Sequence, residues 1–505
     1  MTVLNRLCRP VVTLSCLLVS LSMCVAQKND RFPEDQLLQQ EAAAHLRFLA
    51  SDELLGRMTG SPSIEVAARY IAEQFREWRL EVFPGMEGYF QTVPLQRRIP
   101  STIGQIVLLG DTLVQGKKMA TRNGAPLDWK GDCVYVSYGL VDAAAGTDDY
   151  KGISAKGKAV IARFGSGGDI SPMAAMELSV TKRKVAEEHG AVAFIELYKG
   201  TFAWRGLASY LGRPGMELGA AGANLPHFIV EDTSLVIGTK LQSQRQGQVS
   251  IQSGGIRREP IPARNVIGYI KGSDPKLRDE YVLLTAHYDH IGTGRGRSAT
   301  ADTIFNGARD NAMGVVALIE AAQAFSVQPP KRSVIIAAVT GEEVGEYGSR
   351  HLSANPPVPM DHIVFDLNSD GAGFDDTTIV TVVGLERTTA EGPIQQGSLR
   401  YGLKAIADPV PEQQLFDRSD NANFAALGVP APTYSAGFRS FGDEIMKYYH
   451  KAEDQVDDSF NFSYFLRFCK AYVHSARLIA DMKEKPFWKP GDKYEAVGKK
   501  LYRIR

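Results

Sequence analysis

Residues 281–289 read YVLLTAHYD, an apolar run that ends in a histidine and an aspartate. Two later stretches have the same form: residues 334–343 read VIIAAVTGEE, and residues 363–370 read IVFDLNSD. Compact apolar runs of this kind predict strands that are buried on both faces, and their alternation with helical patterns is typical of a parallel α/β sheet. We therefore expect strands at 281–286, 334–340 and 363–368.

Polar side chains follow each of these expected strands. In open α/β sheets, ligands bind beyond the carboxyl ends of the strands, where His287, Glu342, Glu343 and Asp370 fall. Because side chains alternate along a strand, Asp289 points to the same side as His287, and its carboxylate can orient the imidazole of a metal-bound histidine. The plain alternative for this motif alone is a surface histidine beside an aspartate.

Glu342 and Glu343 are adjacent carboxylates at the end of a buried strand. Such a pair is costly to bury unless a cation holds it. Neighbouring side chains diverge, so we expect one glutamate to bind metal and the other to move protons as a general base. A solvated acidic turn is the alternative, and we favour the functional interpretation.

Three further residues complete a candidate metal site. Asp310 directly precedes an apolar helical run at 315–325, where a carboxylate either caps the helix or bridges two neighbouring cations. Asp370 is preferred to Asp366, which lies inside its apolar run, and His450 comes from a polar loop, KYYHKAEDQ. Two histidines and three carboxylates, one of them shared, suit a pair of zinc ions.

The motifs AHYDHIG, GARDNAMG, TGEEVGEYGS, LNSDGAG, SDNANFAALGVPAP and YYHKAED, in this order, resemble those of the co-catalytic di-zinc aminopeptidase family. Relatives of that family include glutamate carboxypeptidase, glutaminyl cyclase and the transferrin receptor ectodomain. The resemblance extends to the amino-terminal stretch LRFLASDELLGRMTGS, where we expect one helix over 37–55 and a second that begins at Ser61 and Pro62.

The resemblance implies two Zn²⁺ ions per chain and a role for each motif residue. His287 and Asp370 would hold one zinc, Glu343 and His450 the other, and Asp310 would bridge them, with a cis peptide bond before Asn311. Glu342 would be the general base for a hydroxide that bridges the two ions. Asp289 would support His287, and Tyr449 would hydrogen-bond the oxyanion. The sequence departs from the family pattern at Met313, where serine is usual, and at Asn421, where histidine is common.

The sequence pattern in the middle of the chain differs from the pattern on either side. Its 505 residues predict two domains or one α/β domain with a large insertion. Short β-like runs with one clear helical pattern, at 174–189, occupy 99–255 and resemble a protease-associated domain. We expect an α/β fold with a mixed, mainly parallel central sheet flanked by helices. Its peptidase segments would be 27–98 and 256–505, split by this β-rich module.

The first 26 residues are typical of a signal peptide, with Arg6 and Arg9 before an apolar run that is short for a membrane anchor, the alternative considered. We therefore expect an exported protein, periplasmic or secreted, without stable membrane insertion after cleavage. Lys plus Arg and Asp plus Glu both number 57, so no overall charge favours nucleic acid. Cys133 and Cys469 alone follow the leader, which predicts no disulfide framework.

These observations predict a zinc-dependent exopeptidase that acts on peptides, with an aminopeptidase as first choice. A carboxypeptidase or dipeptidase of the same fold is the alternative, because Arg309, Arg418 and Arg439 lie near the motifs and could bind a substrate carboxylate. A non-catalytic, receptor-like binding protein is the less favoured alternative, since all five expected ligands and Glu342 are present.

Overall fold

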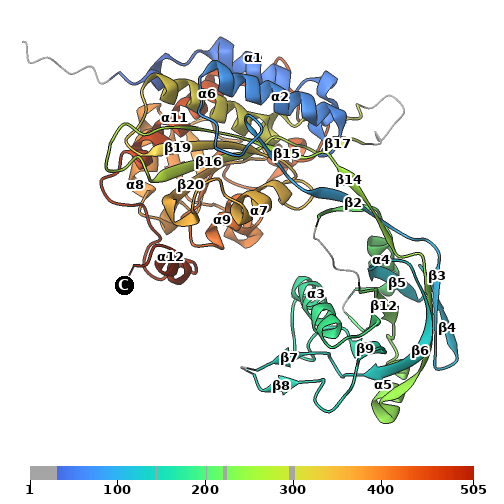
Figure 1. Ribbon diagram of the computed structural model, residues 1–505. Helices are drawn as coiled ribbons and strands as arrows, with labels where there is room; N and C mark the ends of the chain where they lie inside the picture. The colour runs from blue at the N-terminus through green and yellow to red at the C-terminus, as the bar shows by residue number, and fades with distance from the viewer. Residues whose placement is uncertain (1–30, 144, 201, 220–224, 295–301, 505) are drawn as a thin grey trace, which may run out of the picture.

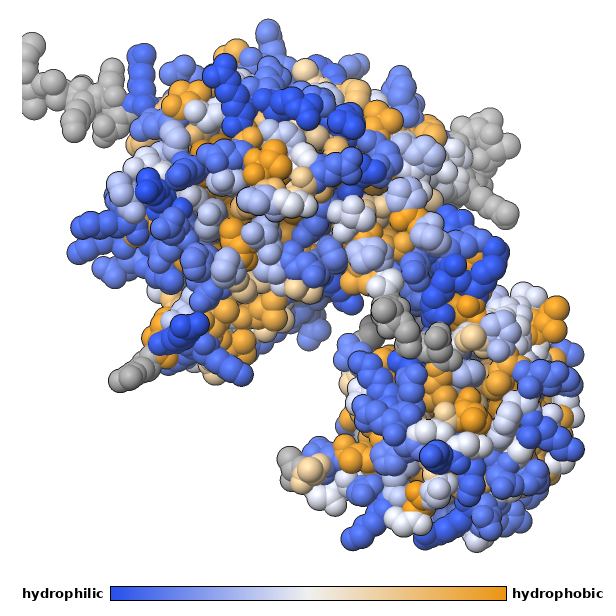
Figure 2. All heavy atoms as spheres, in the orientation of Figure 1, coloured by the Kyte–Doolittle hydropathy of each residue, from blue (hydrophilic) through white to orange (hydrophobic). Residues whose placement is uncertain are grey.

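The computed structural model describes residues 31–504, except 144, 201, 220–224 and 295–301. The expected leader, 1–26, lies outside the described residues. Figure 1 shows two lobes: a large lobe with the amino-terminal helices and the second half of the chain, and a small lobe from the middle of the chain. In the view of Figure 2 the surface of both lobes is mainly hydrophilic, and an open hollow separates them. Within the described ranges no helix is both long and apolar enough to cross a membrane.

The large lobe is built on an eight-stranded mixed sheet in the order β1-β15-β19-β16-β20-β23-β21-β22. Strands β19, β16, β20 and β23 run parallel to one another, and β15 is antiparallel to β19. The expected α/β class with a mixed, mainly parallel sheet is therefore confirmed. The strands are β1 (Phe90–Thr92), β15 (Arg264–Ile270), β16 (Tyr281–His287), β19 (Ser333–Val339), β20 (Ile363–Ser369), β21 (Ile379–Val383), β22 (Lys404–Ile406) and β23 (Thr433–Ala436).

Helices cover both faces of this sheet, which is why its central strands are apolar throughout. In β16, Val282 and Leu284 pack into one core, whereas Leu283 between them packs into the core of the opposite face. The first face is covered by α1 (Gln39–Leu49), α2 (Pro62–Glu77), α6 (Met313–Val327), α8 (Glu391–Arg400) and α11 (Phe462–Ala480). The second is covered by α7 (Tyr347–Ala354), α9 (Asn421–Ala425) and α12 (Glu495–Leu501). In α10 (Asp443–Tyr448), Ile445 packs with Val410 and Phe438 in a separate small cluster.

The amino-terminal helices differ in part from the expectation. The start of α2 is confirmed: Pro62 is its first residue, and the Ser61 hydroxyl accepts the Ile64 N–H at 3.3 Å. The single helix expected over 37–55 is wrong, because α1 ends at Leu49 and a 3-10 turn follows. Gly56 in that turn has φ +68°, and a Cβ there would lie 2.4 Å from the Gly292 carbonyl oxygen. Leu55 and Gly56 both have positive φ, so a helix could not continue through residue 55.

The small lobe has its own eight-stranded sheet, in the order β4-β3-β13-β6-β9-β10-β12-β5. The helix expected at 174–189 is confirmed as α3 (Pro172–Glu188), but α4 (Trp204–Leu211) and α5 (Val236–Gln244) were not predicted, because each spans only about two turns. The strands are β3 (Gly104–Leu108), β4 (Asp111–Val114), β5 (Met119–Asn123), β6 (Leu127–Tyr135), β9 (Ala159–Arg163), β10 (Ala193–Tyr198), β12 (His227–Glu231) and β13 (Gln246–Ser253); β7 (Val141–Asp142) pairs separately with β8 (Thr147–Asp148).

Two adjacent antiparallel strands carry the chain into and out of the small lobe. β2 (Leu95–Pro100) pairs with β14 (Ile256–Ile261), and β11 (Gly215–Leu218) lies on the other side of β2. The boundaries expected at 99 and 255 fall at the small-lobe ends of β2 and β14. A short hairpin of β17 (Gly292–Thr293) and β18 (Ile304–Phe305) belongs to the large lobe.

Candidate metal centre

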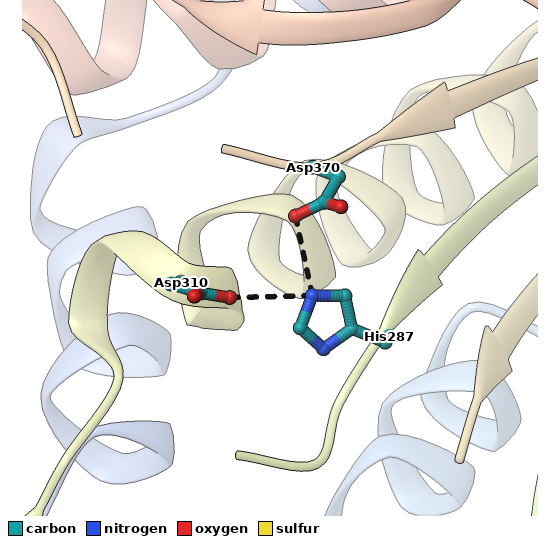
Figure 3. Close-up of side chains that lie close together, drawn as sticks. All are labelled: His287, Asp310 and Asp370. Atoms are coloured by element: carbon teal, nitrogen blue, oxygen red, sulfur yellow. Dashed lines mark hydrogen bonds and ion pairs between the residues drawn. The ribbon is translucent and has the colours of Figure 1, made fainter. Parts of the chain in front are cut away.

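Three expected ligands from different elements meet at the carboxyl edge of the large sheet. His287 is the last residue of β16, Asp370 follows β20, and Asp310 lies in the turn before α6. His287 Nε2 is 3.3 Å from Asp310 Oδ1 and 3.2 Å from Asp370 Oδ1, as Figure 3 shows. Ligand atoms around one tetrahedral zinc ion lie about 3.3 Å apart, given bonds of about 2.0 to 2.2 Å. The group therefore has the donor types and the spacing of a metal site.

A second group lies on the other oxygen of Asp310. His450 Nε2 is 3.4 Å from Asp310 Oδ2 and 3.0 Å from Glu343 Oε2. Burial acts to raise the pKa of Asp310, but interactions with His287 and His450 lower it. Burial acts to lower the pKa of His450, but Asp310 and Glu343 raise it to about 10. All five expected ligands are thus brought together in two groups that share Asp310.

His290 belongs to this cluster, and sequence reasoning missed it. Its Nδ1 lies 2.7 Å from Glu343 Oε1 and 3.9 Å from Asp310 Oδ1, and the residue is buried. Together with Asp310 and Glu343 it forms a group that could hold a metal ion. The strand β16 ends at His287, so side-chain alternation along a strand could not predict where His290 points. The sequence indicated His290 only through its place in the motif AHYDHIG.

Asp289 lies behind the metal-facing residues and approaches His287 more closely through its backbone carbonyl than through its carboxylate. The His287 Nδ1 atom is 3.1 Å from the backbone carbonyl of Asp289 and 3.9 Å from its carboxylate. That carboxylate instead accepts the Thr59 hydroxyl at 2.8 Å and the backbone N–H groups of Glu342 and Glu343 at 3.2 and 3.4 Å. The turn after the strand brings the carbonyl nearer to the ring than the side chain. Asp289 consequently positions the two glutamates.

The turn that carries Asp310 is held by buried hydrogen bonds. The peptide bond between Asp310 and Asn311 is cis, as the family resemblance implied. Asp454, which the sequence did not indicate, accepts the backbone N–H of Arg309 at 2.9 Å and that of Asp310 at 3.0 Å. Asn311 donates its side-chain amide to the Ser369 carbonyl at 2.7 Å. These bonds attach the turn to β20 and to the loop after His450.

Arg57 is a third residue, after His290 and Asp454, that the sequence did not indicate. It is buried and donates to the carbonyls of Leu49, Tyr288 (2.9 Å), Asn306 (2.6 Å) and Gly307 (3.0 Å). Burial lowers the pKa of Arg57 to about 10, so the guanidinium remains charged at neutral pH. It joins the segment after β16 to the segment before Asp310 and places a positive charge beside the acidic cluster.

Ser419 and Asn421 are the first and last residues of the motif SDN, and they have different roles. The Ser419 hydroxyl donates to Asp370 Oδ2 at 2.6 Å, which leaves Oδ1 directed at His287. Asn421 is buried and donates to the carbonyls of Phe416 and Ala431. The departure from the family pattern at Asn421 therefore serves local structure, and Met313, the other departure, is buried at the start of α6.

The two groups open into a cavity of about 360 Å³. Glu342 lines it, and its pKa is raised well above the usual range by burial, with Asp370 adding to the effect and His287 opposing it. Tyr449 also lines the cavity, and its ring stacks on His450 with centroids 4.0 Å apart. Burial raises the pKa of Tyr449 to about 12, so its phenol remains a hydrogen-bond donor at neutral pH.

Of the three arginines near the motifs, Arg418 alone lines this cavity. Arg309 is buried against Asp454, at 3.2 Å, with its guanidinium 3.8 Å from the centre of the Tyr448 ring. Arg439 pairs with Asp376 at 2.7 Å on the surface. Two of the three cationic candidates are thus used for structure.

Comparisons with known proteins agree with this geometry. The model of Peptidase family M28 matches residues 265–468, the segment that carries all five expected ligands. The vacuolar membrane protease of Paracoccidioides lutzii is 28% identical over 176 residues, which are 31% of this chain and 16% of that protein. The "Probable zinc metalloprotease" of Leptosphaeria maculans is 33% identical over 118 residues, 23% of this chain and 26% of that protein.

The chain therefore spans well under a third of the length of these two relatives. Among solved structures, an aminopeptidase from Aneurinibacillus sp. strain AM-1 aligns over 91% of this chain and 98% of its own, with a TM-score of 0.51 and 19% identity, a likeness of fold. Residues 265–468 thus match the model of Peptidase family M28, and the chain shares the fold of this aminopeptidase.

Proposed function

We propose that the chain is a zinc-dependent exopeptidase that removes amino-terminal residues from peptides. The observation that carries the proposal is the position of Asp310, whose two oxygens lie 3.3 Å from His287 Nε2 and 3.4 Å from His450 Nε2. One carboxylate between two histidine-carboxylate groups is the arrangement that two neighbouring cations require.

The residues fit zinc by their chemistry as well as by their spacing. Imidazole nitrogen and carboxylate oxygen are ligands that zinc accepts, and the hard cations Ca²⁺ and Mg²⁺ prefer oxygen alone. His287 with Asp370 would hold one ion, Glu343 with His450 the other, and Asp310 both. Bound zinc supplies two effects there, a lowered pKa of a water molecule and polarisation of the peptide carbonyl.

Glu342 is the proposed general base. Its carboxyl lines the cavity, while its backbone N–H is held by Asp289 at 3.2 Å, so the side chain is presented from a fixed turn. It would accept the proton of the attacking water and pass it to the leaving amine. Tyr449, protonated at neutral pH, would donate a hydrogen bond to the oxyanion.

The charges of the cavity favour a substrate with a free amino terminus. Besides the expected ligands and Glu342, the lining includes the carboxylates of Glu346 and Asp417, of which Asp417 is paired with Lys493 at 2.7 Å. Burial raises the pKa of Glu346, whose carboxylate accepts a hydrogen bond from Asn423 at 2.9 Å. An ammonium group would be stabilised by such a lining. Arg418 supports the second candidate, a carboxypeptidase or dipeptidase, because it can pair with a substrate carboxylate.

Hydrolysis of matched peptides tests this choice. Peptides with a free or an acetylated amino terminus, otherwise identical, are compared by kcat/KM on protein whose zinc content has been measured. Acetylation removes the charge and its hydrogen bonds, a loss of about 1.5 to 3 kcal/mol, so kcat/KM should fall roughly ten- to over a hundredfold. Amidation of the carboxyl end should change little. Equal cleavage of both amino-terminal forms contradicts an aminopeptidase, and dependence on a free carboxylate selects the second candidate.

We also propose export, to the periplasm or the medium, with cleavage of the leader after residue 26. The amino-terminal sequence of the exported protein should then begin at Gln27.

The small lobe is proposed as a protease-associated module that limits access to the site. Its support is a contact between α7 and the strands that link the two lobes: the Tyr347 hydroxyl, four residues beyond Glu343, donates to the Met216 carbonyl of β11 at 2.6 Å.

A further inference from the structure

We propose that His290 is a positioning residue that holds Glu343 as a ligand through a single oxygen. This inference rests on the proposed two-zinc centre and assigns a role to a histidine outside the five expected ligands. His290 would donate its Nδ1–H to Oε1 of Glu343 and leave Oε2 for the metal.

The two oxygens of Glu343 face different histidines. Oε2 lies 3.0 Å from His450 Nε2, on the side where Asp310 Oδ2 also lies, 3.4 Å from the same nitrogen. Oε1 lies 2.7 Å from His290 Nδ1. The atoms that converge on the second ion are therefore Oδ2, Oε2 and Nε2, with Oε1 engaged elsewhere.

No hydrogen bond from another described residue reaches the His290 ring or Glu343 Oε1. His290 Nδ1, His290 Nε2 and Glu343 Oε1 are buried without a hydrogen-bond partner, while Nδ1 and Oε1 lie 2.7 Å apart. Buried polar atoms without partners are costly, so a proton on Nδ1 directed at Oε1 would satisfy both atoms at once.

The ring of His290 is also held in place by the backbone around it. A Cβ on Gly307 would lie 2.6 Å from the His290 Cγ atom, so only glycine at 307 leaves room for the ring. The His290 N–H donates to the Arg57 carbonyl at 3.3 Å. The imidazole cannot turn away from Glu343 without a rearrangement of these segments.

A direct ligand role for His290 fits the distances less well. Its Nδ1 is 3.9 Å from Asp310 Oδ1, whereas the expected ligand nitrogens lie 3.3 and 3.4 Å from the Asp310 oxygens. A glutamate held through one oxygen leaves a coordination position open, as catalytic zinc sites require. Loss of such supporting partners typically weakens metal affinity 10- to 100-fold.

Zinc titration of the metal-stripped full chain tests the proposal. His290→Ala removes the donor, His290→Gln moves an amide nitrogen beyond the Nδ1 position, and His290→Asn places one near it. We expect Ala and Gln to weaken the second Zn²⁺ about 10- to 100-fold with the first unchanged, and Asn to restore affinity to near the wild-type value. His189→Ala, at an exposed histidine after α3, is the matched control and should bind as wild type.

Cobalt spectra separate the remaining outcomes. When saturated with Co²⁺, His290→Asn should keep the wild-type visible absorption, because no ligand is lost. An altered spectrum with equal loss of the second ion in all three variants would make His290 a ligand and overturn the positioning role. Unchanged zinc affinity in folded Ala or Gln variants would also overturn it. Fewer than two ions in the wild type would contradict the proposed function itself.

Discussion

Glu320 in α6 is a buried carboxyl group that no other described residue hydrogen-bonds. Both carboxylate oxygens are buried without a partner, and the side chain is 0% exposed. Burial, with a smaller contribution from Glu41, raises the pKa of Glu320 from 4.5 to about 8, while Lys470 opposes the shift. The helix packs against α1 and α11.

This shift makes stability depend on pH with a definite sign. The folded state binds the Glu320 proton more tightly than the unfolded state, so the stabilising contribution is complete below pH 4.5 and is lost as pH rises to about 8. Each pKa unit corresponds to about 1.36 kcal/mol, so the total loss approaches about 4 to 5 kcal/mol, with about 2 kcal/mol already lost at pH 6.

Glu320→Gln removes the titration while it keeps a polar group of the same size. The unfolding free energies of wild type and variant, measured by urea unfolding from pH 4.5 to 9, should diverge in favour of the variant up to about pH 8 and then run parallel. Peptidase activity should be unchanged. Glu188→Gln, at an exposed glutamate at the end of α3, is the matched control. Parallel curves over the whole range for Glu320→Gln would refute the reasoning.

Three further predictions concern the centre. Asp310→Ala should lose both zinc ions, because each group uses one of its oxygens, and retention of two tightly bound ions on metal analysis would contradict the bridge. Glu342→Gln should bind zinc normally but lose about 10²- to 10⁴-fold in kcat, whereas Glu343→Gln should lose one ion; an exchange of these effects would reverse the assignment. Tyr449→Phe should lower kcat about 10²- to 10³-fold with KM little changed, and an unaltered kcat would remove its oxyanion role.

The sequence alone was sufficient for the central strands and for where the ligands would gather. Strands covered by helices on both faces have continuous apolar runs, so 281–286, 334–340 and 363–368 could be located within one or two residues of β16, β19 and β20. Parallel strands bring their carboxyl ends to one edge, and that rule placed His287 and Asp370 together before any coordinates. Roles and boundaries taken from the family resemblance remain proposals that the experiments above test.

Tertiary structure alone decided the surroundings of the ligands. Beyond the last residue of a strand, side-chain direction depends on how the chain turns, and that turn is set by contacts with remote segments. Arg57 thus joins segments some 230 to 250 residues later in the chain. For the same reason His290 reaches Glu343, and the Asp289 carboxylate lies nearer to the glutamate N–H groups than to the His287 ring. Local sequence patterns cannot predict such contacts, because the partners are distant along the chain. They meet only when helices have packed on both faces of the sheet.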